Sequence, residues 1–425
     1  MRILRGKAAE AYVTKLERRG SRLDEVEPAV RRIVNDVRKN GDRALLKYSC
    51  KFDGLKMGQS LRVTEPEMKA AWKNAPPDLK KTLKVAERRI RQFCEWQKPK
   101  AWMRSHGGIS LGQVVRPLDS VGCYVPGGRF PLVSTLLMTV IPAQVAGVKT
   151  IRIVSPRLPN EVLAAGGMLG VIEFYRTGGA QAIAALAYGT DSIPRVDKIV
   201  GPGNSYITAA KKLVAFDCAI DMLAGPTEVV IISSRGNAVF VAADLVAQAE
   251  HDPETLSVFI TTSEHLGRAV LDNLRGRGPH SALLRAGPHP HINENAAASL
   301  EKRGAVLVAK SSEQAFDWAN RIAPEHIAVE RRDLHLVQNA GSIFIGDYSA
   351  QAAGDYASGP NHVLPTAGAA RFRGGLSVMD FVKVITVQEL SQRGLSKLSP
   401  SIVQLAETEG LRAHADSVRV RCANA

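Results

Sequence analysis

The sequence of 425 residues predicts an α/β fold built on parallel sheets. After residue 110, short β-branched runs such as TIRIVS, TEVVIIS and AVLVAK alternate with helix-length segments, which is typical of parallel strands covered by helices on both faces. The chain also exceeds the usual size of a single hydrophobic core, so we expect two or more domains. A hydrophobic content of 45% with 23% charged residues indicates a globular protein and excludes a disordered one.

Residues 1–105 are expected to be mainly helical. The segment EVEPAVRRIVNDVRKNG places Val30, Ile33 and Val37 at helical spacing, with Gly41 at the helix end. The same region holds 27 of the 56 Lys and Arg residues but 13 of the 41 Asp and Glu residues, and so carries nearly all of the net charge of +15. Glutamates are interspersed and no aromatic stacking motif is present. A solvated helical face is therefore favoured over a nucleic-acid surface.

The apolar and cysteine patterns favour a cytoplasmic protein without a membrane partner. The first residues do not resemble a signal peptide, and the longest apolar region contains Pro142 and Gln144, so it is too polar to span a bilayer. The five cysteines are far apart and form no CxxC pair, which fits a reducing compartment. They are Cys50, Cys94, Cys123, Cys218 and Cys422.

Two junctions between a predicted strand and a predicted helix are rich in glycine. They read SVGCYVPGGRFPLVSTLLM and DKIVGPGNSYITAAKKLV. Small residues at such a junction expose backbone N–H groups and suit a phosphate or pyrophosphate group. Neither segment is GxGxxG, so a purely structural turn remains the alternative.

The segment NRIAPEHIAVE places two groups that can transfer protons at one turn. Residues 311–321 are predicted to form an amphipathic helix, and Pro324 biases Ala323 away from the helical region. Glu325 and His326 then fall in the turn before a strand. In a turn both side chains can reach one site, although a solvated surface pair is the alternative.

Further polar candidates lie in two other segments. DLVAQAEHDPE carries Gln248 and His251 three residues apart on a predicted helix, where both would face one side, as metal ligands or as a hydrogen-bonded surface pair. GDYASGPNHVLPT carries Asp355 and His362 in a stretch too irregular for a helix or a central strand. Such a loop suits either a functional site or a rigid connection.

Eight motifs follow one another along the chain: GCYVPGG, GGAQAIAALAYGT, DKIVGPGN, AGPTEV, QAEHDP, NRIAPEH, GDYASGPNHVLPT and EGLRAHADSV. Together they resemble the histidinol dehydrogenase family over roughly residues 26–420. The resemblance implies oxidation of L-histidinol to L-histidine through L-histidinal, with two NAD+ and one zinc ion per subunit, in the last steps of histidine biosynthesis.

The resemblance also implies roles for individual residues. His326 would be the general base, and Glu325 would activate the water that hydrates the aldehyde. The zinc ligands would be Gln248, His251, Asp355 and His414. The NAD contacts would be Tyr124, Gln181 and Asn204. The substrate contacts would be Thr227, Gln248, His251, His326, Asp355, His362, Glu409 and His414.

The fold that the resemblance implies has two incomplete Rossmann-like domains in a domain-swapped homodimer, with ligands at the carboxyl ends of the strands. Glu409 and His414 would reach the active site of the partner. The expected parts are a helical arm at residues 1–20, a main α/β domain at residues 21–122 and 229–375, an inserted NAD-binding domain at residues 123–228 and a C-terminal arm, helical from about Val378, at residues 376–425.

The sequence departs from the family pattern at a few positions. Thr227 stands where serine is usual, Leu223 where proline is expected, and Arg373 and Gly374 where serines are more usual. Two alternatives therefore remain at this point. One is a related zinc-dependent dehydrogenase of a sulfonated or other small diol. The other is a catalytically silent relative whose basic N-terminal region binds nucleic acid.

Overall fold

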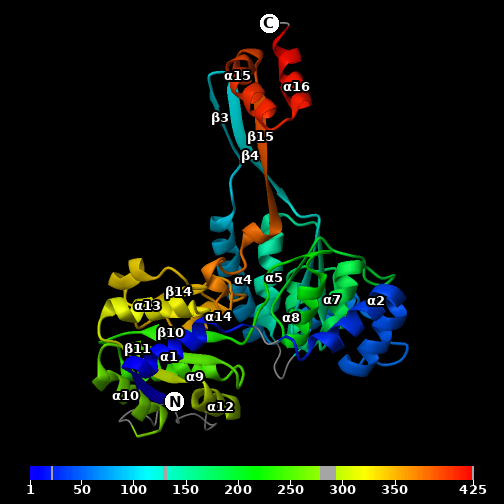
Figure 1. The fold of residues 1–425 in the computed structure, drawn as a ribbon. Helices are drawn as coiled ribbons and strands as arrows, with labels where there is room; N and C mark the ends of the chain where they lie inside the picture. Colours follow the sequence, from blue (N-terminus) through cyan, green and yellow to red (C-terminus); the bar gives the residue numbers. More distant parts are fainter. Residues whose placement is uncertain (21–22, 128–131, 278–292, 424–425) are drawn as a thin grey trace.

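The computed structural model describes residues 1–20, 23–127, 132–277 and 293–423. Its described part contains two six-stranded sheets and one three-stranded sheet (Figure 1). The expected α/β class with parallel sheets is confirmed. All six runs read as strands between residues 150 and 345 are strands. Five of them bury β-branched side chains under the helices, and the edge strand at Ser342–Ile345 is only partly buried.

Sheet I is wholly parallel, and its strand order is β1-β12-β11-β10-β13-β14. Helices α1 and α13 cover one face, and α9, α10 and α12 cover the other. The strands are β1 (Arg2–Arg5), β10 (Glu228–Ile232), β11 (Leu256–Thr261), β12 (Ala305–Val308), β13 (His326–Val329) and β14 (Ser342–Ile345). The helices are α1 (Gly6–Glu17), α9 (Ala238–Ala249), α10 (Glu264–Leu274), α12 (Glu294–Lys302), α13 (Ser312–Ile322) and the short α14 (Gln351–Tyr356).

Sheet II repeats this arrangement with the order β2-β7-β6-β5-β8-β9, in which only the edge strand β2 is antiparallel. Helices α2, α7 and α8 cover one face and α3 to α6 the other. The strands are β2 (Arg62–Val63), β5 (Ser120–Tyr124), β6 (Thr150–Ser155), β7 (Glu173–Arg176), β8 (Lys198–Val200) and β9 (Ala219–Ile220). The helices are α2 (Glu27–Tyr48), α3 (Glu65–Asn74), α4 (Pro77–Gln97), α5 (Val133–Ala146), α6 (Asn160–Met168), α7 (Gly179–Tyr188) and α8 (Ser205–Val214).

Sheet III is an antiparallel sheet that extends away from the other two, with two helices at its far end (Figure 1). Its order is β15-β4-β3, and β15 pairs with β4 over nine residues. The elements are β3 (Trp102–His106), β4 (Ile109–Pro117), β15 (Val382–Leu390), α15 (Gln392–Thr408) and α16 (Arg412–Cys422). We call these elements the extension.

The observed parts differ from the expected domain boundaries in three places. Residues 1–20 are not a helical arm, because Arg2–Arg5 forms the edge strand of sheet I and only the following residues are helical. The helices within residues 21–122 pack on sheet II and not on the main domain, since α2 contacts α7 and α8, and α4 contacts α5. The C-terminal segment has only a four-residue 3-10 helix at Val378–Phe381, and strand β15 follows before the α-helices begin.

Within the described ranges, no helix combines the length and the apolar character that crossing a membrane requires. All five cysteines are free thiols.

Candidate active site

The catalytic candidates gather at the amino edge of sheet I. Strands β10 and β13 are neighbours that start at this edge, and α1, α9 and α13 end there because each of these helices runs antiparallel to the strand before it. In this sheet the candidate residues therefore lie at the opposite edge from the carboxyl ends of the strands, where ligands were expected.

The turn between α13 and β13 carries Glu325 and His326. The helix predicted over residues 311–321 is observed as Ser312–Ile322, and Ala323 takes up a left-handed conformation with φ of 48°, which ends the helix before Pro324. His326 does not lie in the turn, because it is the first residue of β13 and pairs with Val229 of β10. Glu325 immediately precedes the strand, so both side chains can still reach one site.

Glu325 is anchored through one carboxylate oxygen. Its Oε2 accepts hydrogen bonds from the Thr227 hydroxyl and, at 2.9 Å, from the backbone N–H of Glu228. Among the described residues, its second oxygen has no hydrogen-bond partner. Burial raises the pKa of Glu325 to about 7, against the opposing effects of His326 and of these two donors. A carboxyl group with this pKa can take up a proton near neutral pH.

His326 is buried between backbone and carboxylate groups. Its Nδ1 lies 3.3 Å from the carbonyl oxygen of Glu228, and its Nε2 lies 3.6 Å from Oδ1 of Asp355. Nδ1 also lies 3.3 Å from Nε2 of Gln248. Of these two neighbours only the carbonyl oxygen can accept a proton from Nδ1, and a proton held there would leave Nε2 with its lone pair. Burial lowers the pKa of His326, but the carboxylates of Glu325 and Asp355 outweigh it and hold the pKa above 6.5.

Gln248 occupies the last turn of α9 and is 2% exposed. Its Nε2 donates to the Thr227 hydroxyl, and its carbonyl oxygen is without a hydrogen-bond partner in the described part of the chain. His251 does not share a helical face with Gln248, because α9 ends at Ala249. It lies in the following loop with an exposed side chain, and its backbone N–H donates to the backbone carbonyl oxygen of Gln248 at 3.3 Å, whereas the unpartnered oxygen of Gln248 is the side-chain Oε1.

Asp355 lies in the last turn of the short helix α14, so the expectation that its segment is too irregular for a helix is wrong at this residue. Burial raises its pKa, but the contact with His326 and the charges of His362 and His251 bring it below the usual value. His362 follows in an irregular stretch, as predicted. Its Nδ1 lies 2.8 Å from the carbonyl oxygen of Asp355, and its Nε2 lies 3.4 Å from Oγ1 of Thr135 in α5. His362 therefore connects this cluster with sheet II.

Three of the four expected zinc ligands belong to this neighbourhood. Gln248 and Asp355 flank His326, and His251 follows Gln248 in the next loop, with its backbone N–H bonded to the backbone carbonyl oxygen of Gln248. Amide oxygen, carboxylate and imidazole are all donors that zinc accepts, and the unpartnered oxygen of Gln248 is available for such a bond. The residues present therefore fit the metal. The described residues of this one chain contain no group of three or more His, Cys, Asp or Glu placed to hold a metal.

The fourth expected zinc ligand, His414, and the expected substrate contact Glu409 lie elsewhere. Both are exposed, Glu409 at the end of α15 and His414 in the first turn of α16. Figure 1 shows these two helices at the far end of the extension, away from sheet I. This chain therefore does not bring them to its own catalytic cluster.

The expected NAD contacts meet at the carboxyl edge of sheet II. Tyr124 ends β5, and its hydroxyl accepts the N–H of Gly179 at 3.4 Å. Gln181 lies in the first turn of α7. The side-chain oxygen of Asn204 caps α8 by accepting from two backbone N–H groups, at 3.1 and 3.2 Å. Helices α7 and α8 thus both begin at this edge of the sheet, and the N–H groups at a helix start suit the binding of an anionic group.

Several residues that shape these sites were not among the candidates. Asp53 accepts from Gln181 Nε2 at 3.0 Å and from the N–H of Gly178 at 2.9 Å, and so holds the start of α7. Glu228 contacts both catalytic candidates through its backbone and pairs with Arg19 through its side chain. Glu228 follows Thr227 in the AGPTEV motif, so the motif could have identified it. Arg19 is 209 positions from Glu228 and belongs to no sequence motif that could have identified it.

The chain is similar to known proteins over nearly its whole length. A sequence profile described as histidinol dehydrogenase matches residues 16–422. The histidinol dehydrogenase of Methanosarcina barkeri is 44% identical, with 97% of this chain and 96% of the relative covered, and that of Methanothermobacter thermautotrophicus is 44% identical, with 96% of each covered. The crystal structure of histidinol dehydrogenase from Elizabethkingia anophelis superimposes with a TM-score of 0.91 at 34% identity, covering 100% of this chain and 98% of that one.

Two doubly wound sheets, with paired proton-transfer groups on one and exposed helix starts on the other, define an α/β oxidoreductase. The matches make the assignment more specific. The chain belongs to the histidinol dehydrogenase family.

Proposed function

We propose that this protein oxidises L-histidinol to L-histidine through L-histidinal with two NAD+, as the last steps of histidine biosynthesis. The observation that carries the proposal is the pair Glu325 and His326, whose Oε2 and Nδ1 atoms are 3.7 Å apart. Both residues are anchored on Glu228, yet each keeps another atom free for a proton. Two oxidations with a hydration between them require two such groups.

In the first oxidation, the lone pair of His326 Nε2 takes the proton of the alcohol while hydride leaves the same carbon. The N–H group of Nδ1 donates to the carbonyl oxygen of Glu228 throughout, which keeps the ring in this orientation. Bound NAD+ would supply the two-electron acceptor, and bound zinc would supply a fixed anchor for the nitrogen atoms of the substrate.

In the hydration step, the free oxygen of Glu325 removes a proton from water while the water oxygen bonds to the aldehyde carbon. The pKa of about 7 makes this group a stronger base than an ordinary carboxylate, although it remains partly ionised at neutral pH. His326 returns its first proton to the carbonyl oxygen, which completes the hydrate and restores the base. It then accepts a hydroxyl proton of the hydrate as the second hydride leaves for a second NAD+, and the carboxylic acid is formed.

We assign the zinc ligands to Gln248, His251 and Asp355 of one chain and to His414 of a second copy. The side-chain amide of Gln248 and the carboxylate of Asp355 lie on the two sides of the His326 ring, so a metal held by both would be close to the base. His414 is exposed on the extension and available to another chain. Glu409, at the end of the preceding helix α15, would pair with the ammonium group of the substrate, and His362 and Thr227 would contact the substrate from this chain.

A domain-swapped homodimer supplies the second copy. Sheet III supports it, because large apolar side chains on this small sheet are between 41% and 49% exposed. These residues are Trp102, Met103, Leu111, Val384 and Ile385. We assign NAD to the carboxyl edge of sheet II, where Tyr124, Gln181 and Asn204 meet.

We also place the enzyme in the cytoplasm. The presence of five free thiols supports a reducing compartment.

The test is NADH formation by the purified protein with L-histidinol, measured before chelation, after chelation and after zinc is restored. The expected yield is about two NADH per histidinol consumed, lost on chelation and regained with zinc. Absence of turnover by folded, zinc-loaded protein would contradict the proposal. NADH formation from a sulfonated diol instead would identify the related diol dehydrogenase.

A further inference from the structure

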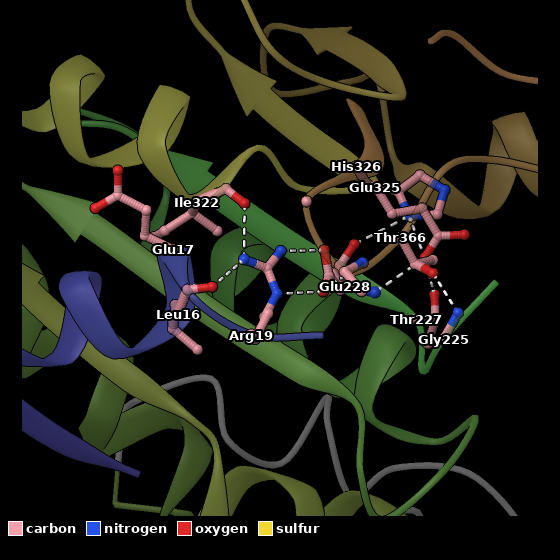
Figure 2. Close-up of polar contacts among 12 residues, drawn as sticks. Leu16, Glu17, Arg19, Gly225, Thr227, Glu228, Ile322, Glu325, His326 and Thr366 are labelled. Carbon is pink, nitrogen blue, oxygen red and sulfur yellow. Dashed lines mark hydrogen bonds and ion pairs between the residues drawn. The ribbon is translucent and has the colours of Figure 1, made fainter. Parts of the chain in front are cut away.

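Arg19 lies two residues beyond the end of α1 and makes four hydrogen bonds with its guanidinium group (Figure 2). Nε and Nη2 donate to the two carboxylate oxygens of Glu228 at 2.7 and 2.6 Å. Nη1 donates to the carbonyl oxygens of Leu16 at 2.7 Å and Ile322 at 2.8 Å. The side chains of Arg19 and Glu228 are only 13% and 5% exposed, so water screens this ion pair little.

Glu228, the first residue of β10, touches both catalytic candidates. Its N–H donates to Oε2 of Glu325 at 2.9 Å, and its carbonyl oxygen lies 3.3 Å from Nδ1 of His326. Its side chain points the other way, to Arg19, and also accepts the N–H of Ala367 at 3.1 Å. A rotation of the two peptide groups of Glu228 would therefore displace both proton-transfer groups, and its bound side chain prevents that rotation.

The fourth hydrogen bond of Arg19 reaches the turn that carries the catalytic pair. Ile322 is the last residue of α13, three positions before Glu325. Arg19 thus holds the pair from both sides, through β10 and through the end of α13. Its positive charge also lies at the carboxyl ends of α1 and α13, where the helix dipoles favour a cation. The rigid fork of arginine matches these four acceptors, whereas the single ammonium group of lysine does not.

We propose that Arg19 is a positioning residue for catalysis, which keeps the Glu228 backbone and the Glu325–His326 turn in the geometry that both oxidation steps need. The proposal rests on the function proposed above. It assigns a role in the reaction to the N-terminal segment.

The test compares Arg19→Lys and Arg19→Ala with the wild type in single-turnover and steady-state assays. Both variants should lower kcat about 10- to 100-fold for the alcohol and for the aldehyde, since small misplacements of catalytic groups have effects of this size. KM for histidinol and the zinc content should change little, because Arg19 touches neither ligand. Added guanidinium ion should restore part of the activity of Arg19→Ala. The neighbouring Arg18→Ala, whose side chain is exposed, should behave as the wild type.

A second variant separates positioning from folding. Removal of Arg19 alone leaves a buried carboxylate without its partner, which destabilises the protein. The double variant Arg19→Met with Glu228→Gln removes that charge as well, so its stability should recover while kcat stays low. The proposal would be overturned if Arg19→Lys had the kcat of the wild type. It would also be overturned if the double variant recovered its kcat together with its stability.

A failure of the proposed function gives a different result. In that case the wild type would not turn over histidinol at all, and amide hydrogen exchange would still test the positioning role without substrate. Arg19→Lys should then speed up exchange in residues 228–232 and 323–329 relative to Arg18→Ala. Equal exchange rates in the two variants would overturn the role of Arg19.

Discussion

Sheets I and II have the same strand order but present their functional residues at opposite edges. In each sheet the first strand of the chain, β1 or β2, lies at one edge. Of the other five strands, the first (β10 or β5) is central, the second and third lie to one side, and the fourth and fifth lie to the other. The NAD candidates of sheet II lie at the carboxyl edge, at the starts of α7 and α8. The catalytic cluster of sheet I lies at the amino edge, at the ends of α1, α9 and α13. Topology alone therefore does not decide which edge carries the chemistry.

The use of opposite edges in the two sheets matches the charge of the group that each edge is proposed to bind. Helix starts carry partial positive charge and suit the pyrophosphate of NAD. Helix ends carry partial negative charge and suit cations, which at sheet I are Arg19 and the proposed zinc ion. His362 connects the two edges, since its ring contacts both Asp355 and Thr135 of α5. One active site can thus use opposite helix ends for its two cofactors.

The strongest test of the comparison removes the base from sheet I. His326→Asn should reduce turnover of both histidinol and histidinal about 1,000-fold, because no other group accepts the proton. NAD+ binding at sheet II should remain unchanged, as measured by titration calorimetry. The exposed His335→Asn serves as a control and should keep full activity. Full turnover by His326→Asn would disprove its assignment as the base.

Glu325→Gln should separate the two steps. The amide cannot take a proton from water, so oxidation of histidinal should slow about 100-fold while oxidation of histidinol slows less. Rapid-quench measurement of each step would show accumulation of aldehyde. Equal slowing of both steps would mean that Glu325 mainly supports His326.

His414 tests whether the extension completes sheet I of another copy. His414→Ala should weaken zinc binding about 10- to 100-fold in competition with a chelator. Subunits carrying His414→Ala and subunits carrying His326→Asn should complement each other when unfolded together and refolded. Random pairing gives one intact site in half of the dimers, or about a quarter of wild-type activity. No recovery in the mixture would show that His414 serves its own chain.

Thr227 is expected to give the smallest effect. Its hydroxyl donates to Glu325 and accepts from Gln248, which turns the amide oxygen of Gln248 toward the proposed metal. Thr227→Ser keeps both bonds and should change kcat and zinc affinity less than about threefold, while the similarly sized Thr227→Val should weaken zinc binding about tenfold. If Thr227→Val and Thr227→Ser had equal zinc affinity, the hydroxyl would not orient Gln248.

Sequence patterns predicted the parts of the fold that depend on local periodicity. The strands of sheet I after residue 228 and the helix before Glu325 are observed because alternating or helical apolar spacing dictates their burial. The packing of α2 to α4 on sheet II was not predicted, because an apolar helix face does not reveal which sheet covers it. Strand β1 was missed because a four-residue run flanked by arginines gives too weak a pattern.

The candidate site was predicted to a similar extent. The sequence motifs identified Glu325, His326, Gln248 and Asp355, and the structure brings these four together. Arg19 has no motif, and its role depends on a contact that only the folded chain creates. Glu409 and His414 lie on the extension, and their positions depend on sheet III. Strand β15 of that sheet was not predicted, because its residues belong to a segment that was expected to be helical.

The pairing of β1 with β12 has a consequence for the order of folding. Arg2 pairs with Ala305, so this contact closes a loop that contains all of sheet II. During synthesis, sheet II can form once β9 has emerged, whereas the edge strand of sheet I must wait for a segment made much later. Chains that stop before β12 would release β1 unpaired. The amino edge that carries out the chemistry is thus among the last parts of the enzyme to take shape.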